Sequence, residues 1–320
     1  TGYAPIIRAA QKVQDAPKPE WLGRDRWYVD RMEKEHDYRS PTLLYEFAAW
    51  YKENPNATLI AGATDVGLWV TKGLQDLGNV CFLKQIDELA EIEKTADGLV
   101  IGAGASINQL RDAVTPYYSD FAEMLRRFAS TQVRNAGTLG GNIANGSPIG
   151  DCAPALIALN ATMTLQCGFE TRDIPVEDFF LEYGKQDIRP GEFVRSFFIP
   201  DQPDRVKCYK LSKRFDQDIS AVCGCFMINV EDGIVADARI AFGGMAGTPK
   251  RASSVEQALI SMPWQYESVE GVLPKMTQDF TPMSDMRASA EYRMQTAQGM
   301  LKRYLLEDFD HTTRVLEVSS

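Results

Sequence analysis

The feature that most constrains this sequence is the segment 130–151, which contains five glycines and many hydroxyl and amide side chains. Apolar stretches expected to be helices flank it at 120–128 and 153–159. Connections in compact domains are usually about 4–6 residues long, and much longer ones tend to be functional. The segment fits neither G-x-x-x-x-G-K-[ST] nor G-x-G-x-x-G, so neither phosphate-binding mechanism is supported. We therefore expect a long functional loop of another kind.

A second glycine-bearing segment, Leu59–Gly67, joins an expected strand directly to an expected helix. We expect Gly62 to adopt a backbone torsion that other residues resist, so that successive N–H groups face outward and suit a pyrophosphate. The alternative is an ordinary strand-to-helix turn in which Thr64 or Asp65 is the N-cap. This segment alone does not decide between the two.

The spacing of apolar residues predicts an alternation of strands and helices, then a second unit. In the first unit the expected strands are 58–61, 80–83, 99–102, 162–167 and 193–199, and the further helices are 43–50, 66–74 and 107–113. In the second unit they are strands 206–211, 219–230 and 234–242 and helices 254–260, 266–273 and 286–306. Glu231-Asp232-Gly233 is a hairpin signal.

These elements and the proline-containing stretch 200–203 predict the domain organisation. We expect a linker or docking arm without clear periodicity at 1–37, a first domain at 38–203, a small α+β domain at 204–312 and a tail at 313–320.

Composition excludes several classes of function. With 34 Lys+Arg against 44 Asp+Glu, the net charge of −10 argues against a nucleic-acid binder or a polybasic membrane binder. No apolar run approaches the roughly 20 residues of a membrane span. The N-terminus lacks a signal-peptide pattern, so we expect a cytoplasmic protein.

The counts of histidine and cysteine limit the available chemistry. The two histidines, His36 and His311, are expected at the surface, which excludes a Ser-His-Asp triad or a Cys-His pair in the middle of the chain. No C-x-x-C pair occurs, so we expect buried, reduced thiols and no metal site. The cysteines are Cys81, Cys152, Cys167, Cys208, Cys223 and Cys225. Any redox chemistry must come from a cofactor.

Four motifs in order carry a resemblance to a known family. They are AGATDVGLWVTK (61–72), QVRNAGTLGGNIANGSPIGD (132–151), YKLSKRFDQDISAV (209–222) and RIAFGGMAGTPKRA (239–252). Over about 38–306 the chain resembles the FAD-binding part of the xanthine dehydrogenase small subunit, in the molybdenum hydroxylase family. The opening TGYAPII resembles the sequence that follows the last iron–sulfur cysteine there, which implies that the iron–sulfur domain is missing from this chain.

The resemblance implies an α+β fold class: the two-subdomain FAD-binding fold of the vanillyl-alcohol oxidase type, followed by a small α+β C-terminal domain. The residues implied to wrap the FAD pyrophosphate are Leu59, Ile60, Ala61, Gly62, Ala63, Thr64, Asp65 and Val66. Those implied to line the cofactor or shape its loop are Phe128, Thr138, Gly140, Gly141, Asn142, Ser147, Asp151, Val194 and Lys210. Asp65 is the expected catalytic residue, beside the incoming nicotinamide.

The residues themselves leave simpler roles open. Phe128 could equally be a core residue, Asp151 an N-cap and Lys210 a solvated strand residue. The charged stretch 214–218 matches the part of the family near the NAD acceptor, but charges in a loop are usually only solvated.

The function implied is electron transfer. Electrons would leave a purine at the molybdenum cofactor of a partner large subunit, pass through iron–sulfur clusters, reduce FAD and leave as hydride to NAD, within a hetero-oligomer. Two alternatives stay open: an FAD subunit of a related aldehyde or carbon monoxide dehydrogenase, and a non-catalytic FAD-holding assembly module.

Overall fold

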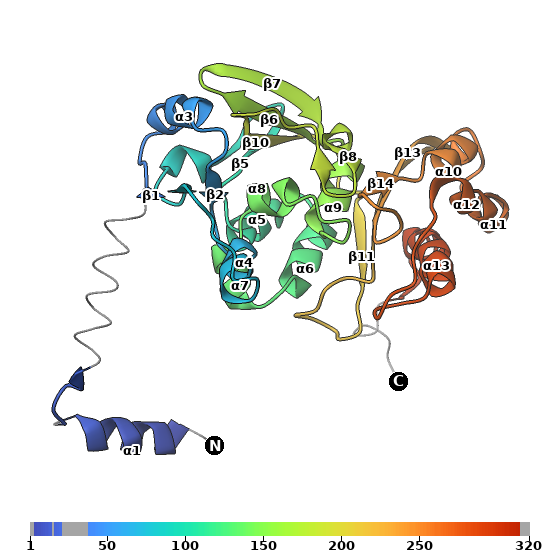
Figure 1. The fold of residues 1–320 in the computed structure, drawn as a ribbon. Helices are drawn as coiled ribbons and strands as arrows, with labels where there is room; N and C mark the ends of the chain where they lie inside the picture. The colour runs from blue at the N-terminus through green and yellow to red at the C-terminus, as the bar shows by residue number, and fades with distance from the viewer. Residues whose placement is uncertain (1–2, 15, 21–37, 314–320) are drawn as a thin grey trace.

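A computed structural model describes residues 3–14, 16–20 and 38–313 of this chain (Figure 1). Helix α1 (Tyr3–Val13) forms inside the segment that we expect to be a linker or docking arm without clear periodicity. Its alanine, arginine, glutamine and lysine residues favour helix locally, even though the side chains of Ile6, Ile7 and Val13 are exposed. The rest of the expected arm, 21–37, lies outside the described residues, as does His36.

The first subdomain is a small parallel sheet of three strands in the order β1-β3-β2. Its elements are β1 (Tyr38–Arg39), α3 (Leu44–Glu53), β2 (Thr58–Ile60), α4 (Val66–Thr71) and β3 (Val80–Phe82). Helix α3 buries Leu44, Phe47 and Ala48 on one face, as its apolar spacing predicts. The ring centre of Phe47 lies 4.7 Å from that of Phe193, which joins this subdomain to the next.

The second subdomain is built on an antiparallel sheet with strand order β4-β5-β10-β6-β7. Helices α5 to α9 lie along one side of this sheet (Figure 1), and apolar residues of α5, α6, α8 and α9 share its core. The strands are β4 (Ile92–Lys94), β5 (Gly98–Gly102), β6 (Thr162–Cys167), β7 (Glu170–Pro175) and β10 (Phe193–Pro200). The helices are α5 (Ile107–Val114), α6 (Ser119–Arg127), α7 (Thr131–Ala136), α8 (Leu139–Ala144) and α9 (Cys152–Ala158). Between β7 and β10 come η2 (Val176–Phe179), β8 (Phe180–Glu182) and β9 (Lys185–Gln186), and η1 (Asp87–Leu89) precedes β4.

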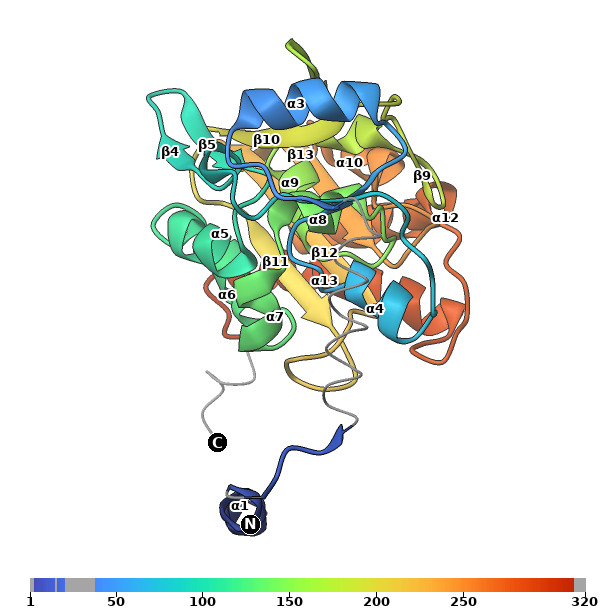
Figure 2. The same ribbon diagram turned by 60° about the vertical axis from the view of Figure 1, so that its left-hand side comes forward.

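The glycine-rich segment is not the continuous loop that we expected, because α7 and α8 lie within it (Figure 2). Each helix has six residues and begins at a hydroxyl N-cap: Ser130 Oγ accepts from the amide of Val133, and Thr138 Oγ1 accepts from the amide of Gly141. Helices this short show too little periodicity for a sequence pattern to reveal.

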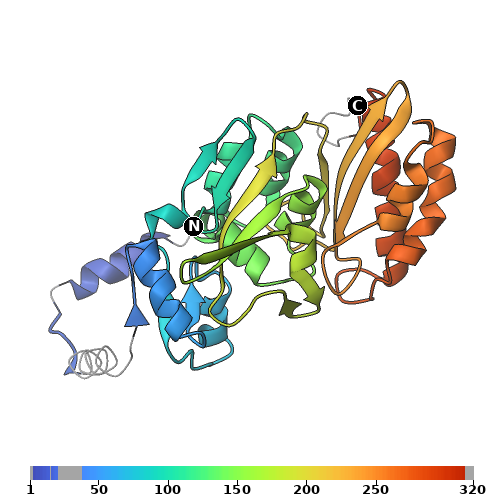
Figure 3. The same cartoon turned by 90° about the horizontal axis from the view of Figure 1, so that it is seen from above.

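The C-terminal domain is an antiparallel sheet of order β11-β12-β13-β14 with helices on its outer side (Figure 3). The strands are β11 (Lys207–Leu211), β12 (Val222–Glu231), β13 (Ile234–Gly243) and β14 (Lys250–Arg251). The helical elements are α10 (Ser253–Leu259), α11 (Tyr266–Val272), η3 (Leu273–Lys275), α12 (Met276–Asp279) and α13 (Ala290–Asp308). The expected hairpin is confirmed: Glu231 pairs with Ile234, and Asp232 and Gly233 have φ values of 50° and 77°. This arrangement confirms the predicted α+β fold class.

The two domains share a core at their seam. The inner face of the C-terminal sheet packs against α6 and α9, and Cys223 and Cys225 join the core of the second subdomain there. All six cysteines are free thiols, four of them buried and two partly buried. In the described part of the chain, no helix combines the length and apolar character that crossing a bilayer requires.

Candidate functional site

The two glycine segments meet in space. A Cβ atom added to Gly62 would lie 2.0 Å from the carbonyl oxygen of Ala136, and one added to Gly137 would lie 3.4 Å from Thr64 Oγ1. Glycine is therefore needed at 62 for close approach between backbones. The expected unusual torsion is not at Gly62, because the positive φ of this turn, 56°, belongs to Ala63.

The turn that leads into α4 presents free amides. Among the described residues, the backbone N–H groups of residues 62–65 have no hydrogen-bond acceptor. Consecutive unpaired amides in a turn form a typical anion-binding concavity. Asp65 occupies the N-cap position but makes no side-chain cap bond, and its exposed carboxylate has no partner in the described chain. The turn thus has donors for a phosphate and a carboxylate with no structural role.

The second glycine segment is anchored to the end of β5. The amide of Leu139 donates to Ala105 O over 2.9 Å, and that of Gly140 donates to Ala103 O over 2.8 Å. A Cβ at Gly140 would lie 2.6 Å from the Cβ of Ala103, so glycine lets α8 approach this strand end. At Gly141 an added Cβ meets only Thr138 Oγ1, at 3.0 Å, which leaves the outward side open.

One polar atom in this segment lacks a partner. The side-chain oxygen Oδ1 of Asn142 is buried and has no hydrogen-bond donor in the described chain. A Cβ on Gly150 would lie 3.5 Å from it. Ser147 Oγ accepts a long bond, 3.4 Å, from the amide of Ile149. Because buried polar atoms are nearly always satisfied, the orphaned oxygen fits a site that a ligand completes.

A buried ion pair joins the two domains at the end of the same segment. Lys210 Nζ, on β11, lies 2.7 Å from Asp151 Oδ2, and the two side chains are 1% and 4% exposed. Ser220 Oγ accepts from Lys210 Nζ over 2.7 Å and donates to Asp151 Oδ1. Lys210 is thus not a solvated strand residue, and Asp151 stands at the N-cap of α9 without a cap bond. No pattern predicted this role for Ser220, which lies inside the expected strand 219–230.

Arg293 on α13 fixes the backbone next to the Lys210–Asp151 ion pair. Its guanidinium donates to the carbonyl oxygens of Ala221 and Gly244 and pairs with Asp285 at 2.7 Å. Gly244 has a φ of 83°, and its amide donates to Pro148 O over 2.8 Å. Burial acts to raise the pKa of Asp285, but hydrogen bonds from backbone amides and from Arg293 outweigh it and lower that pKa. Through these hydrogen bonds the C-terminal domain holds the end of the glycine segment in place.

The other predicted site residues have positions and contacts that do not by themselves point to a ligand. Phe128 is half-buried at the C-cap of α6 and packs against the core, which agrees with its simpler role. Val194 is buried in β10. In the stretch 214–218, Arg214 and Asp218 pair at 3.4 Å, and the guanidinium of Arg127 lies 4.8 Å from the ring centre of Phe215.

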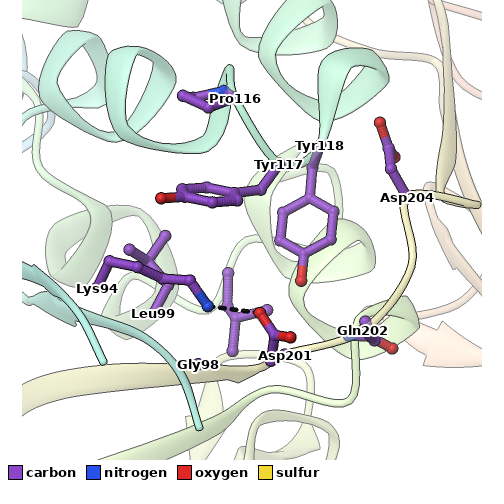
Figure 4. A pocket seen from close by; sticks show the side chains of 10 residues that line it. Lys94, Gly98, Leu99, Pro116, Tyr117, Tyr118, Asp201, Gln202 and Asp204 are labelled. Carbon is purple, nitrogen blue, oxygen red and sulfur yellow. Dashed lines mark hydrogen bonds and ion pairs between the residues drawn. The ribbon is translucent and has the colours of Figure 1, made fainter. Parts of the chain in front are cut away.

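Two surface cavities lie away from these residues. One, of about 250 Å³, lies beneath the connection between the domains, where Tyr117 and Tyr118 stand beside the Lys94–Asp201 ion pair (Figure 4). The other, of about 200 Å³, is lined by Cys167, Arg172 and their neighbours. Within the described residues, no cluster of His, Cys, Asp and Glu side chains is arranged to hold a metal ion.

Comparison with known proteins identifies the family. Residues 32–202 match the FAD binding domain in molybdopterin dehydrogenase, and residues 207–308 match the CO dehydrogenase flavoprotein C-terminal domain. The chain therefore belongs to the FAD-binding subunits of the molybdenum hydroxylase family, which confirms the resemblance seen in the sequence motifs.

Relatives of this chain differ in their named substrates. It is 28% identical to the xanthine dehydrogenase FAD-binding subunit of Escherichia coli O157:H7, over 82% of this chain and 97% of the relative. It is 32% identical to a nicotinate hydroxylase of Emericella nidulans over 84% of this chain, which spans only 22% of that longer relative. A solved carbon monoxide dehydrogenase from Hydrogenophaga pseudoflava superposes with a TM-score of 0.79 at 26% identity, over 87% of this chain and 98% of that one.

The residues present fit FAD. A dinucleotide pyrophosphate needs several donors close to backbone, which the free amides of 62–65 supply. Gly62 allows the close approach of that turn to Ala136, Gly140 allows the approach of α8 to Ala103, and Asn142 Oδ1 is left for a ligand to satisfy. These observations concern residues that the motifs had already singled out.

Proposed function

We propose that this chain is the flavin-bearing electron-transfer subunit of a xanthine dehydrogenase, which passes electrons from purine hydroxylation through FAD to NAD. The observation that carries the proposal is the meeting of the free amides at 62–65 with the glycine segment at Ala136 and Gly137. The xanthine dehydrogenase FAD-binding subunit of E. coli, matched over 97% of its length, supports the choice of substrate. Bound FAD would supply the redox chemistry itself.

The protein's part is binding, orientation and electrostatics. In the proposal the segment from Leu59 to Val66 binds the pyrophosphate through its amides, while Phe128 and Val194 offer apolar surface to a flat ring. Thr138, Gly140, Gly141, Asn142 and Ser147 shape the loop around the cofactor. Lys210 holds a positive charge at the domain seam, fixed by Asp151, where it would favour an electron-rich reduced ring. Asp65 keeps a free carboxylate at the turn for the incoming nicotinamide.

A second candidate is an FAD subunit that serves a different molybdenum enzyme. The 32% identity to a nicotinate hydroxylase and the likeness to carbon monoxide dehydrogenase favour it specifically. An aldehyde-oxidising partner is a further form of this alternative, and these candidates share the FAD site and differ in the partner that delivers electrons. A non-catalytic FAD-holding assembly module, with no turnover of its own, is a separate alternative.

The proposed partners are a molybdenum-cofactor-binding large subunit and an iron–sulfur polypeptide, in a cytoplasmic hetero-oligomer. The reduced, free thiols suit that compartment. Isolation of the native complex from gently lysed source cells should recover both partners. A native chain that runs alone in gel filtration, with no larger species, would contradict the assembly.

Substrate is tested on that isolated complex. Xanthine, nicotinate, an aldehyde and carbon monoxide are supplied in turn, and bleaching of the flavin absorption is followed with NAD absent. The proposal expects rapid bleaching with xanthine alone among the four. Bleaching by nicotinate, aldehyde or carbon monoxide instead would establish the alternative.

A further inference from the structure

Arg134 on α7 is a buried cation that the predicted site did not include. Its side chain lies within the glycine-rich segment, and the residue is only 8% exposed. Its Nη1 donates to the carbonyl oxygens of Phe128 and Ala129 at 2.6 and 2.7 Å. Nη2 donates to Thr131 Oγ1 at 3.0 Å and Nε donates to Asn108 Oδ1 at 3.2 Å. All four acceptors are neutral oxygens.

The turn that Arg134 contacts is strained. Phe128 has φ −68° and ψ 123°, and Ala129 has a φ of 41°, which is similar to the central residues of a type II turn. The second of these positions usually takes glycine, because in the left-handed region the Cβ of any other residue lies too close to the following carbonyl oxygen. Ala129 is therefore held in a conformation that it does not prefer.

Arg134 is well suited to hold Ala129 in this conformation. Two consecutive carbonyl oxygens converge on one guanidinium nitrogen, which fixes the orientation of both peptide groups. Hydrogen bonds from a charged donor are shorter and stronger than those between neutral groups, so this pair of bonds stabilises the strained turn. Burial lowers the pKa of Arg134, and nearby Arg111 and Arg126 lower it further, so the fold holds this guanidinium at an electrostatic cost.

We propose that Arg134 is a positioning residue for the flavin: it clamps the Phe128–Ala129 turn so that the Phe128 ring faces the cofactor. This inference rests on the proposed function, in which Phe128 lines the flavin. Arg134 acts through the turn and is not itself a catalytic residue. A lysine at this position keeps the charge but lacks the planar fork that spans the acceptors.

The test compares Arg134→Met and Arg134→Lys with Arg126→Met, using the FAD dissociation constant and the visible circular dichroism of bound flavin. Arg126 is a matched control because it lies on α6, is exposed and pairs with Glu123 at 2.7 Å. We expect both Arg134 variants to weaken FAD binding about tenfold or more, as loss of about 1.4 kcal/mol does, and to change the dichroism. Arg126→Met should leave both unchanged.

A rescue separates positioning from general destabilisation. Ala129→Gly removes the backbone strain, so in the Arg134→Met background it should restore much of the FAD affinity and the dichroism. Wild-type dichroism and affinity in Arg134→Met, or failure of Ala129→Gly to restore either, would overturn the inference. A wild-type chain that binds no FAD would instead overturn the proposed function, so the two failures are distinguishable.

Discussion

Lys210 and Asp151 form an ion pair across the domain seam, with Nζ and Oδ2 2.7 Å apart and both side chains buried. Lys210 lies on the first strand of the C-terminal domain, and Asp151 ends the glycine-rich segment of the first domain. Ser220 bonds to both, so three side chains from the two domains satisfy one another. The pair ties the position of one domain to the loop proposed to hold FAD.

Breaking this pair should be costly. Lys210→Met leaves the Asp151 carboxylate buried without its cation, and removal of one partner of a buried pair typically costs about 3–5 kcal/mol. We expect urea unfolding to report a loss of that order. Lys210→Met combined with Asp151→Leu should cost clearly less than the sum of the two single changes. Additive effects would show that the residues do not interact.

The partly exposed Lys94–Asp201 pair provides the control. It lies at the surface cavity of Figure 4 and joins β4 to the interdomain connection. Solvent screens such pairs, so Lys94→Met should change the free energy of unfolding by no more than about 1 kcal/mol.

Gly62→Ala should weaken FAD binding by at least about a hundredfold, because its Cβ would overlap the carbonyl of Ala136 and force the two glycine segments apart. Gly67→Ala is the matched control on the same turn. No atom lies within 4 Å of a Cβ at Gly67, and alanine there should stabilise α4 slightly. Equal FAD affinity in the two variants, measured by titration of flavin fluorescence, would remove the turn from the site.

Gly141→Val tests the open side of α8. The fold itself opposes an added side chain only at Thr138 Oγ1, so the C-terminal domain should stay folded while flavin binding is abolished. Gly271→Val, at another glycine with open surroundings, should leave flavin binding unchanged. A yellow Gly141→Val preparation would count against the assignment.

Alkaline pH should destabilise the C-terminal domain through Tyr304. Burial raises the pKa of Tyr304 to about 12 from its usual 10.0. The folded state therefore disfavours the phenolate, and the stabilisation is complete below pH 10 and is lost as pH rises towards about 12. Two pKa units correspond to about 3 kcal/mol. Tyr304→Phe should reduce the fall in unfolding free energy between about pH 9 and pH 12. An unchanged fall would assign it to other groups.

Local patterns predicted much of the fold. The Asp232-Gly233 hairpin followed from turn chemistry, and α3 from apolar spacing around Phe47. Short capped helices such as α7 and α8 were not predicted, because they are defined by hydroxyl N-caps and are too short to show periodicity. Helix α1 was not predicted either, since Ile6, Ile7 and Val13 are exposed and do not pack on the described core.

The candidate site was likewise predicted only in part. The glycine content pointed to both segments as candidate sites. It did not explain why residue 62 must be glycine, because the contact of Gly62 with Ala136 depends on tertiary packing. Lys210 could be placed on a strand, yet its burial depends on how β11 meets α6 and α9. Ser220 and Arg134 lie inside the matched motifs, but their roles could not be predicted, since each acts through bonds to residues that only the fold brings near.

Asp65→Ala tests the proposed acceptor side. The carboxylate makes no bond within the described chain, so its loss should leave the fold and the FAD dissociation constant nearly unchanged. In stopped-flow mixing, the rate of flavin reduction by NADH should fall. An unchanged NADH rate would remove Asp65 from the site, and a large loss of FAD affinity would assign it to cofactor binding instead.

The most direct measurement is the visible absorption spectrum of the purified chain after incubation with FAD and removal of free cofactor. We expect the spectrum of a bound oxidised flavin, which bleaches when NADH is added and stays oxidised with xanthine, because electrons from a purine need the partner's centres. A preparation that stays colourless would contradict FAD binding, and bleaching by xanthine without partner chains would contradict the proposed division of labour.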